Sequence, residues 1–237
     1  MSSGKNKKMT INLKRNDFKK NFYEIIAWEQ KGFVCGIDEV GRGCLAGPVV
    51  TAAAVLTAQE TPEFIVDSKA LSKPELLKAY QWLTKNCRFS IGIVNNHNID
   101  KLNIWQATLV AMKKSTISLF WQINSFPIAI LVDAMPLKLD DTIYKDVPVH
   151  SFTKGESKSV SIAAASIIAK VTRDQLVEKY DTIFPGYQFF DHKGYGTEIH
   201  RLAIEKYGHT IVHRESFLKN MLYPSFGDIN GQQLPIF

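Results

Sequence analysis

The apolar positions of the first fifty residues follow a helical spacing and then change to runs typical of strands. Over residues 15–30, phenylalanine and isoleucine recur every three to four positions, which predicts a helix with one apolar face, ended by Gly32. Residues 33–38 (FVCGID) and 48–56 (PVVTAAAVL) are short apolar runs separated by glycines and a proline. We therefore expect two neighbouring strands joined by a glycine-rich connection.

The rest of the chain alternates between patterns typical of strands and of helices. Ser72 followed by Glu75 has the spacing of a capping box and predicts the start of a helix. The further expected elements are a strand at 87–94, a helix at about 98–123, a buried strand at 127–133, a strand at 147–152, a helix at 157–180 and a helix capped by Thr197. An early meander followed by alternating strands and helices predicts an α/β sheet with helices on its faces.

The length of the chain, 237 residues of which 45% are hydrophobic, suits one globular domain rather than two. We expect that domain over residues 15–223, between a basic arm at 1–14 and a tail at 224–237 without periodicity. The longest apolar run, 162–169, is too short to span a bilayer, so we expect no membrane partner.

The cysteines indicate a reducing compartment. They are odd in number and far apart, in neither a C-x-x-C nor a zinc-finger spacing: Cys35, Cys44 and Cys87. This disfavours both a disulfide framework and a zinc framework. Together with the lack of an expected membrane segment, it predicts a cytoplasmic protein.

The formal charge of +6 suits a polyanionic partner, because each phosphate neutralised by Lys or Arg releases condensed counterions. A lysine-rich surface kept for solubility would give the same composition. Much of the excess lies in residues 5–20, which a solvated arm would also explain. Charge alone therefore leaves the type of partner open.

Acidic residues stand at the ends of two apolar runs. Asp38 and Glu39 end the first predicted strand, and on a regular strand their side chains would point to opposite faces. The flanking Gly36 and Gly41 make plausible a bulge that turns both carboxylates into one cleft. Asp133 ends the run IAILVD, and carboxylates rarely enter a core unless they are paired or bind metal. Converging carboxylates would suit a pair of hard cations, whereas an isolated Asp-Glu pair is more often a solvated strand end.

Two loops could approach a phosphate. Gly41-Arg42-Gly43 directly follows the two carboxylates, and positions without a side chain let backbone N–H groups approach a phosphate or a sugar hydroxyl. Standing alone, this segment would be a hairpin turn. The loop at 154–159 (KGESKS) opens a helix, whose N-terminus favours anions, although alone it would be a simple helix start.

Tyr195 lies between two glycines in the segment HKGYGT. Its ring could stack on a base or a sugar, although a loop tyrosine is more often packed locally. None of His200, His209 and His213 has metal-ligand spacing to a second ligand of its kind. We therefore expect these histidines to be structural or exposed.

Taken together, these segments resemble the ribonuclease HII family. The matching motifs follow the family's order over roughly residues 22–223: GIDEVGRGCLAGPVV (36–50), DSKALS (67–72), LVDAMP (131–136), KGESKS with IAAASIIAKVTRD (154–174), HKGYGT (192–197) and HRESF (213–217). Their number and order argue against coincidence. The resemblance implies an RNase H-like fold, with a central mixed β-sheet flanked by helices and a C-terminal helical region.

The resemblance also implies an active site of four carboxylates that binds two Mg²⁺ or Mn²⁺ ions. Asp38, Glu39 and Asp133 match three of these catalytic ligands. The fourth position, normally an Asp, is Glu156 here. Because Glu is one methylene longer, the metal site would be displaced, slower or different in its metal preference. We expect Glu156 to ligate nonetheless.

By the same resemblance, Gly41, Arg42 and Gly43 would read the ribose 2′-hydroxyl beside the scissile phosphate. Tyr195 would pack on the sugar of the next nucleotide, and Lys69 would contact phosphate. The implied substrates are RNA-DNA hybrids and DNA duplexes that contain ribonucleotides. Cleavage is expected on the 5′ side of the ribonucleotide, leaving a 3′-hydroxyl and a 5′-phosphate, by a monomeric enzyme.

Other interpretations remain open at this point. Ribonuclease HIII is a relative with an added N-terminal domain, and the roughly thirty residues before the Asp38 strand are too few for one. A non-catalytic nucleic-acid binder with a decayed site would explain Glu156, although three carboxylates and both substrate loops are intact. The final GQQLPIF is faintly similar to a sliding-clamp-binding motif, but we expect an unstructured or packed terminus there.

Overall fold

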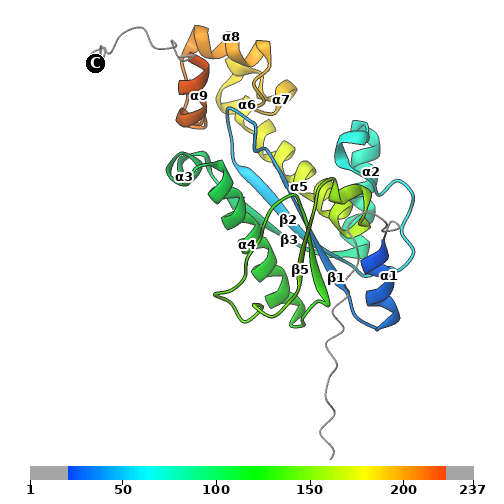
Figure 1. Cartoon of the computed structure of the whole chain (residues 1–237). Coiled ribbons are helices and arrows are strands. Elements are labelled where there is room, and N and C mark those ends of the chain that lie inside the picture. Colours follow the sequence, from blue (N-terminus) through cyan, green and yellow to red (C-terminus); the bar gives the residue numbers. More distant parts are fainter. Residues whose placement is uncertain (1–20, 223–237) are drawn as a thin grey trace, which may run out of the picture.

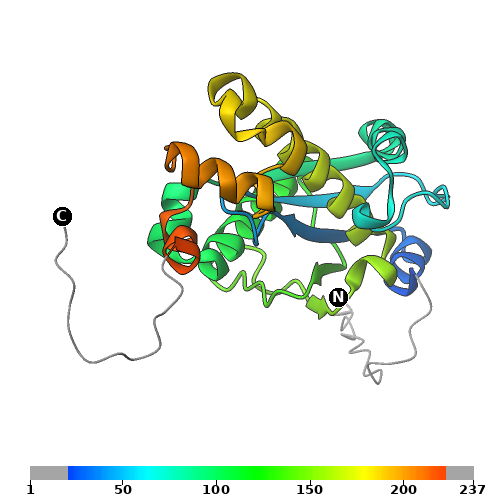
Figure 2. The ribbon, with the colours of Figure 1, turned by 90° about the horizontal axis from the view of Figure 1, so that it is seen from above.

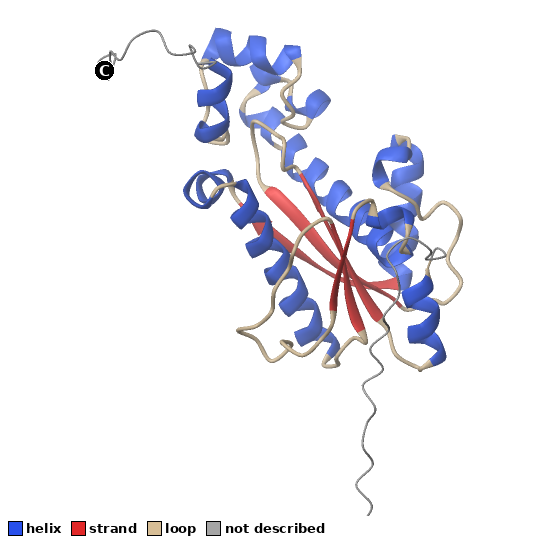
Figure 3. Cartoon of the chain, viewed as in Figure 1, coloured by secondary structure: helices blue, strands red, loops and turns tan. Residues whose placement is uncertain are grey.

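The centre of the molecule is a five-stranded sheet with the strand order β3-β2-β1-β4-β5 and helices on both faces (Figure 1 and Figure 3). The computed structural model describes residues 21–222. The expected arm at 1–14, the first residues of the predicted helix at 15–30 and the tail at 224–237 with its GQQLPIF segment lie outside the described residues. The domain bounds 15–223 therefore stay a prediction.

The elements have the following bounds. The strands are β1 (Val34–Val40), β2 (Val49–Leu56), β3 (Cys87–Val94), β4 (Ala129–Asp133) and β5 (Val149–Phe152). The longer helices are α1 (Phe22–Glu29), α2 (Lys73–Asn86), α3 (Asn96–Leu102), α4 (Ile104–Ile123), α5 (Val160–Glu178), α8 (Glu198–Tyr207) and α9 (Glu215–Leu222). The short helical turns are η1 (Ser68–Ala70), η2 (Gly155–Ser157), α6 (Tyr180–Ile183), η3 (Pro185–Tyr187) and α7 (Phe189–His192).

The sheet is mixed, which confirms the expected fold class. Strands β1, β2 and β3 pair antiparallel as a meander, whereas β4 runs parallel to β1 and β5 runs parallel to β4. Parallel neighbours need a crossover connection, and α4 is the long helix that leads from β3 back to β4. The strand-helix alternation expected for the second half of the chain is interrupted between β4 and β5, because residues 134–148 join these parallel strands without a helix.

Helix α5 covers one face of the sheet and α4 covers the other (Figure 2). The alanines of α5 pack with Ala52 and Ala54 of β2, while Cys35 and Ile37 of β1 pack with α4 on the opposite face. Gly36 brings α5 very close, because a Cβ at that position would lie 2.1 Å from the carbonyl carbon of Ser161. Small residues on both surfaces therefore allow β1 to pack directly against α5.

Two helix predictions need correction. The single helix expected at about 98–123 is two helices, because Asn103 takes a positive φ of 66° and its side chain accepts a hydrogen bond from the Gln106 N–H at 3.0 Å, which caps α4. The helix expected at 157–180 begins only at Val160 and ends at Glu178. The predicted capping box is confirmed, since the Ser72 N–H donates to Glu75 Oε2 at 2.8 Å.

The C-terminal helices form a separate apolar cluster beside the connection between β1 and β2, as expected for a helical C-terminal region (Figure 1). Thr197 caps α8 as predicted, by accepting from the His200 N–H. The cluster contains Tyr187, Phe189, Ile204 and Leu218 together with Leu45 of the connection. Within the described residues there is no helix whose length and apolar character would allow it to cross a membrane.

Candidate active site

The sheet topology brings Asp38 and Asp133 to the same edge. Strands β1 and β4 are parallel neighbours, and their last aligned pair is Ile37 with Val132. The next residue on each strand is therefore an aspartate. Distant parts of the sequence thus place two carboxylates side by side near the carboxyl ends of adjacent parallel strands, a region where α/β sheets commonly bind ligands.

The bulge suggested for Asp38 and Glu39 is absent. Strand β1 pairs with β2 without interruption from Gly36 to Val40, so the two carboxylates leave a regular strand on opposite faces. Glu39 nevertheless belongs to the same charge cluster: burial raises the pKa of its carboxyl, and the nearby charge of Asp133, the last residue of β4, raises it further. The carboxylates meet around the open end of the sheet rather than on one of its faces.

Burial and mutual repulsion raise the pKa of these groups. Only 7% of Asp38 is exposed, and burial, followed by the charges of Glu39 and Asp133, raises the pKa of its carboxyl well above the ordinary value. Burial also raises the pKa of Glu39, against the opposing effect of the Arg42 guanidinium. The protein therefore confines like charges in a poorly solvated place.

Protein groups donate hydrogen bonds to each of these three carboxylates, but one buried oxygen has no partner. The Glu39 N–H donates to Asp38 Oδ1 at 2.7 Å, and the Gly155 N–H donates to Asp133 Oδ1 at 2.8 Å. Arg42 Nη1 lies 3.4 Å from Glu39 Oε1, whereas the buried Oε2 of Glu39 has no hydrogen-bond partner. Between residues 21 and 222, no three acidic, histidine or cysteine side chains are arranged closely enough to hold a metal ion as they stand.

Glu156 lies at the same edge, in the turn η2 that follows β5. Burial raises the pKa of its carboxyl, and the charges of Asp133 and Asp67 raise it further. The preceding residue, Gly155, packs so closely that a Cβ there would lie 3.3 Å from Asp133 Oδ1. The structure therefore brings the fourth sequence-predicted carboxylate close to Asp133.

The helix N-terminus after the loop at 154–159 is not free for an external anion. Ser159 caps α5, and its hydroxyl donates to Glu24 Oε1. The same carboxylate oxygen accepts from the Ser161 N–H at 3.1 Å, and Glu24 is 1% exposed. The sequence pattern indicated an anion-binding position, and the chain fills it with its own carboxylate from α1.

The glycines at 41 and 43 serve different purposes. Gly41 has a φ of +91°, and a Cβ there would lie 2.1 Å from Arg173 Nε, so this position needs glycine for folding. Around Gly43 a Cβ would meet nothing within 4 Å. Arg42 lies between them, with its guanidinium 5.7 Å from the centre of the Trp105 ring. Gly43 is therefore the place where this loop leaves open space.

Two fully buried arginines hold this loop. Both belong to family motifs, but the sequence alone indicated no role for them. Arg214 donates to the carbonyls of Gly41, Arg42 and Gly47 at 2.7, 2.9 and 2.9 Å. Arg173 donates to the carbonyls of Ala46, Pro48 and Lys193 at 3.0, 3.0 and 2.8 Å. Neither forms an ion pair within the described part of the chain, and burial lowers the pKa of Arg214 to about 10.

Tyr195 is 38% exposed and lies beside the β1–β2 connection, where its backbone forms a bridge with Cys44. Burial, together with the neighbouring Cys44, raises the pKa of its hydroxyl to about 12. Lys170 Nζ and the Arg173 guanidinium each lie 5.7 Å from the centre of its ring. The ring is thus partly exposed to solvent and also lies close to two cationic side chains.

Lys69 stands near the carboxylates, in the turn η1. It is exposed, and its charge partly opposes the rise in pKa that burial causes in Glu39 and Glu156. The hydroxyls of Ser68 and Ser166 are 2.8 Å apart, which ties this turn to α5. Ser166 also lowers the pKa of Asp38 through a hydrogen bond.

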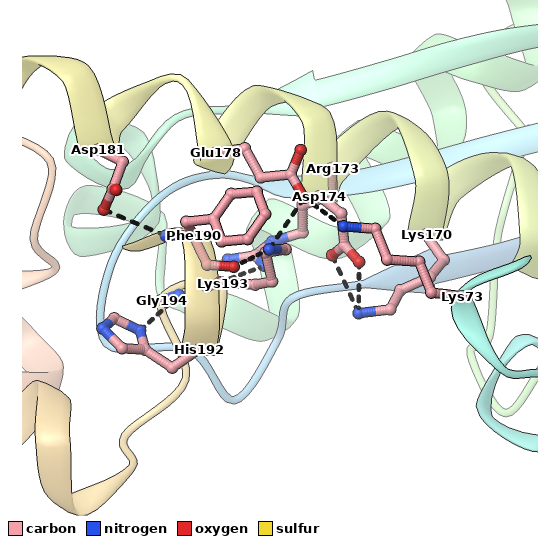
Figure 4. A network of polar contacts seen from close by, with 10 residues as sticks. All are labelled: Lys73, Lys170, Arg173, Asp174, Glu178, Asp181, Phe190, His192, Lys193 and Gly194. Atoms are coloured by element: carbon pink, nitrogen blue, oxygen red, sulfur yellow. Dashed lines mark hydrogen bonds and ion pairs between the residues drawn. The ribbon is translucent and has the colours of Figure 1, made fainter. Parts of the chain in front are cut away.

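A polar network links α2, α5 and α7 next to Tyr195 (Figure 4). Lys193 and Lys73 contact Glu178 Oε1 at 2.9 and 3.6 Å, and Lys170 contacts Asp174 at 2.9 Å. The three lysines line one groove between these helices. Lysines from three different segments therefore meet beside α5, each paired with a carboxylate of that helix.

Solved structures of ribonucleases H share this fold. The complex of PCNA and RNase HII from Archaeoglobus fulgidus matches with a TM-score of 0.63 and 21% identity over 85% of this chain and 98% of that one. The Bst-RNase HIII structure in complex with Mn²⁺ matches with a TM-score of 0.59 and 22% identity over 85% of this chain and 73% of that one. At this identity the likeness defines the fold, which is that of the RNase H-like α/β proteins.

The sequence comparisons define the family. The family model of ribonuclease HII matches residues 35–220. Ribonuclease HII of Clostridioides difficile is 46% identical over 80% of this chain and 71% of its own length, and that of Lactobacillus acidophilus is 40% identical over 92% and 83%. The chain belongs to the ribonuclease HII family, as the motif resemblance implied, and it is an endoribonuclease of the ribonuclease H type.

The repulsion within the carboxylate cluster leads to a first prediction. Asp38→Asn keeps the volume but removes one buried like charge, so without divalent ions we expect a melting temperature at pH 8 that is higher by at least about 2–4 °C, the effect of 1 kcal/mol in a chain of this size. Because the folded-state pKa of Asp38 is raised, the wild type loses stability as pH rises through that pKa. The difference in thermal unfolding should therefore shrink toward pH 4. A difference in melting temperature that does not change with pH would contradict this prediction.

The two glycines give a matched pair of variants. We expect Gly41→Ala to lose about 1–3 kcal/mol, because alanine is strained at a φ of +91° and Arg173 must move. Gly43→Ala should change the free energy of unfolding by less than about 0.5 kcal/mol, since its Cβ meets open space. Urea denaturation of both variants measures this difference. Equal losses would show that Gly43 is also required by the fold.

Proposed function

We propose that the protein is a metal-dependent endonuclease that hydrolyses the RNA strand of RNA-DNA hybrids and cuts on the 5′ side of single ribonucleotides in duplex DNA. The products would be a 3′-hydroxyl and a 5′-phosphate. The observation that carries the proposal is the buried acidic cluster at the end of β1 and β4, with its raised pKa values and the unpartnered Oε2 of Glu39. All four carboxylates come from one chain, so a monomer suffices. We propose a cytoplasmic enzyme.

The donor set of the cluster fits hard divalent cations. Carboxylate oxygens are the ligands that Mg²⁺ and Mn²⁺ prefer, and a cation would satisfy the unpartnered oxygen and relieve the repulsion between Asp38 and its neighbours. Asp38, Glu39, Asp133 and Glu156 would hold two such ions. When bound, the ions supply Lewis acidity for attack of water on a phosphodiester and for departure of the leaving oxygen.

The remaining residues of the site would bind and orient the nucleic acid. The open space at Gly43 and the guanidinium of Arg42 stand next to the carboxylates, where backbone and side chain could contact a ribose 2′-hydroxyl and its phosphate. Lys69, near Glu39, would contact a phosphate. Tyr195 would pack on the sugar of the following nucleotide, and its partial exposure leaves the ring accessible. The 2′-hydroxyl is the only mark of RNA in such a duplex.

The decisive experiment uses a DNA duplex with one ribonucleotide, incubated with the full chain and Mn²⁺ or Mg²⁺. Product with a 5′-phosphate at the ribonucleotide would support the proposal. Binding without product in either metal would indicate a nucleic-acid binder with a decayed site. Cleavage of a hybrid but not of this duplex would favour specificity of the ribonuclease HIII type.

The next prediction concerns Asp133, one of the proposed metal ligands. We expect Asp133→Asn to lower cleavage by more than about a hundredfold, beyond the 10- to 100-fold effect typical of residues that only support a ligand. Its melting temperature without metal should not fall, because the side chain keeps its volume and loses a repulsive charge. Cleavage rates and thermal unfolding are measured on the same preparation. Near-normal activity would remove Asp133 from the site.

The exchange of Asp for Glu at the fourth position can be tested directly. We expect Glu156→Asp to be as active as the wild type or more active with Mg²⁺, because the shorter side chain restores the family's usual residue. The measurement is the rate of single-ribonucleotide cleavage at several Mg²⁺ and Mn²⁺ concentrations. Glu156→Gln, which keeps the length but not the charge, is the matched control and should lose activity. A complete loss in Glu156→Asp would show that this chain requires the longer side chain.

A further inference from the structure

Tyr195 sits in a tight turn, residues 192–197, whose backbone leaves little freedom. Lys193 and Gly194 have positive φ angles of 50° and 81°, and the Gly194 carbonyl accepts from the N–H groups of Leu45 and Ala46 at 2.8 and 3.3 Å. On this side Arg173 also donates to the Lys193 carbonyl. These contacts fix the backbone on one side of the turn. On the other side the turn is supported by hydrogen bonds within a cluster of three histidines, His192, His200 and His213.

The hydrogen bonds of these histidines determine which ring nitrogen carries the proton. The Thr210 N–H donates to His213 Nδ1 at 2.9 Å, so the proton of His213 is on Nε2. That nitrogen lies 3.1 Å from His200 Nε2, which must then accept. The remaining nitrogen of His200, Nδ1, lies 2.8 Å from the Tyr195 carbonyl and must donate to it. A directed chain therefore runs from Thr210 through both histidines to the backbone of Tyr195.

His192 supports the neighbouring peptide in the same way. Its Nε2 lies 2.7 Å from the Tyr187 carbonyl and donates to it, and its Nδ1 accepts from the Gly194 N–H at 3.1 Å. The rings of His192 and His200 are stacked, with centres 4.1 Å apart and an angle of 15° between their planes. The Gly194 N–H and the Tyr195 carbonyl, which flank the Gly194-Tyr195 peptide bond, are thus each hydrogen-bonded to one ring of this histidine stack.

Each of the three rings accepts one hydrogen bond through an unprotonated nitrogen, so a second proton would replace that acceptor by a donor and break the bond. The three rings are buried, with exposed fractions of 7%, 0% and 2% for His192, His200 and His213. Burial lowers the pKa of His200 and of His213 to about 4. The charged or titratable groups around the rings are Asp181 of α6, Asp191 of α7, Arg173 of α5, Tyr187, Tyr195, His209 and Arg214.

We propose that His200 and His213 form a positioning chain that fixes Tyr195 for substrate selection, with His200 locked in the Nδ1–H tautomer. This inference rests on the proposed function, in which Tyr195 packs on the sugar next to the scissile phosphate. The histidines touch neither substrate nor metal in this arrangement. They act through the Tyr195 carbonyl, which holds the ring at a constant place relative to the carboxylates.

The first test reads the tautomers directly and needs no activity. Long-range ¹H–¹⁵N spectra of the imidazole rings in the wild-type protein should show His200 protonated on Nδ1 and His192 and His213 protonated on Nε2. None of the three should take up a second proton between pH 8 and pH 6. An Nε2–H form of His200, or titration near its ordinary pKa of about 6.5, would overturn the proposal.

The second test separates the two hydrogen bonds of His200. In His200→Asn the amide can donate from the place of Nδ1, so the bond to the Tyr195 carbonyl is kept and the bond from His213 is lost. In His200→Gln the amide can accept at the place of Nε2, and the bond to Tyr195 is lost instead. Each variant loses one buried hydrogen bond, so we expect similar decreases in melting temperature.

The activities of these two variants should differ. For single-ribonucleotide cleavage, we expect kcat/KM to fall about 10- to 100-fold in His200→Gln, as is typical of residues that position another group, and less than about threefold in His200→Asn. In a Tyr195→Ala background, which itself should lower single-ribonucleotide cleavage more than cleavage of a continuous RNA strand, His200→Gln should have less than about a twofold further effect.

The outcomes distinguish the inference from the function on which it rests. If the wild type cleaves and Tyr195→Ala impairs it, equal activities of His200→Asn and His200→Gln, or a full effect of His200→Gln in the Tyr195→Ala background, would overturn the positioning chain alone. If the wild type cleaves nothing, the proposed function fails, while the tautomer spectra still test the chain. If Tyr195→Ala cleaves both substrates normally, the positioning chain fails because Tyr195 selects nothing.

Discussion

The repulsion between carboxylates at the end of β1 and β4 is the constraint around which this molecule is organised. Asp38 is almost fully buried beside the charges of Glu39 and Asp133, an arrangement that a fold avoids unless the charges serve a purpose. The protein offsets the repulsion only in part, with donors from backbone N–H groups, from Ser166 and from Arg42. The rest of the repulsion remains in the protein. If the cluster binds hard cations as proposed, affinity for them and lower stability without them would be two consequences of the same arrangement.

The two buried arginines are, like Asp38, charged groups that the fold places out of water. Taking a guanidinium out of water is costly, and Arg173 and Arg214 recover hydrogen bonds from six backbone carbonyls rather than from carboxylates. Because those carbonyls point toward the arginines, the loop around Gly43 can present N–H groups and open space on its other side. An ion pair in place of this arrangement would cancel positive charge close to where a phosphate backbone is proposed to lie.

Local patterns in the sequence predicted the strands, and the family resemblance implied that the carboxylates converge. The strand order β3-β2-β1-β4-β5, which places Asp38 beside Asp133, was not predicted. Nor could the sequence predict interactions between distant residues. Glu24 reaches the start of α5 from 137 positions away, and Arg214 reaches the Gly41 carbonyl from 173 positions away. The break at Asn103 was missed because the apolar spacing continues across it, while only the positive φ of one asparagine ends α3. The histidines were predicted to be structural or exposed, and the structure shows His200 and His213 buried and His209 exposed.

Helix α5 connects the two halves of the proposed chemistry. Its first turn is held by Glu24 and lies against Gly36, Ser166 faces Asp38, and Arg173 donates to the turn that carries Tyr195. From Ser166 to Arg173 is about 10 Å of rigid helix at 1.5 Å per residue. Since one helix positions both the acidic cluster and the Tyr195 turn, their separation cannot drift with loop motion. A fixed separation is what a nuclease needs if it is to select one sugar in a duplex and cut beside it, because a nucleotide step is itself a fixed length.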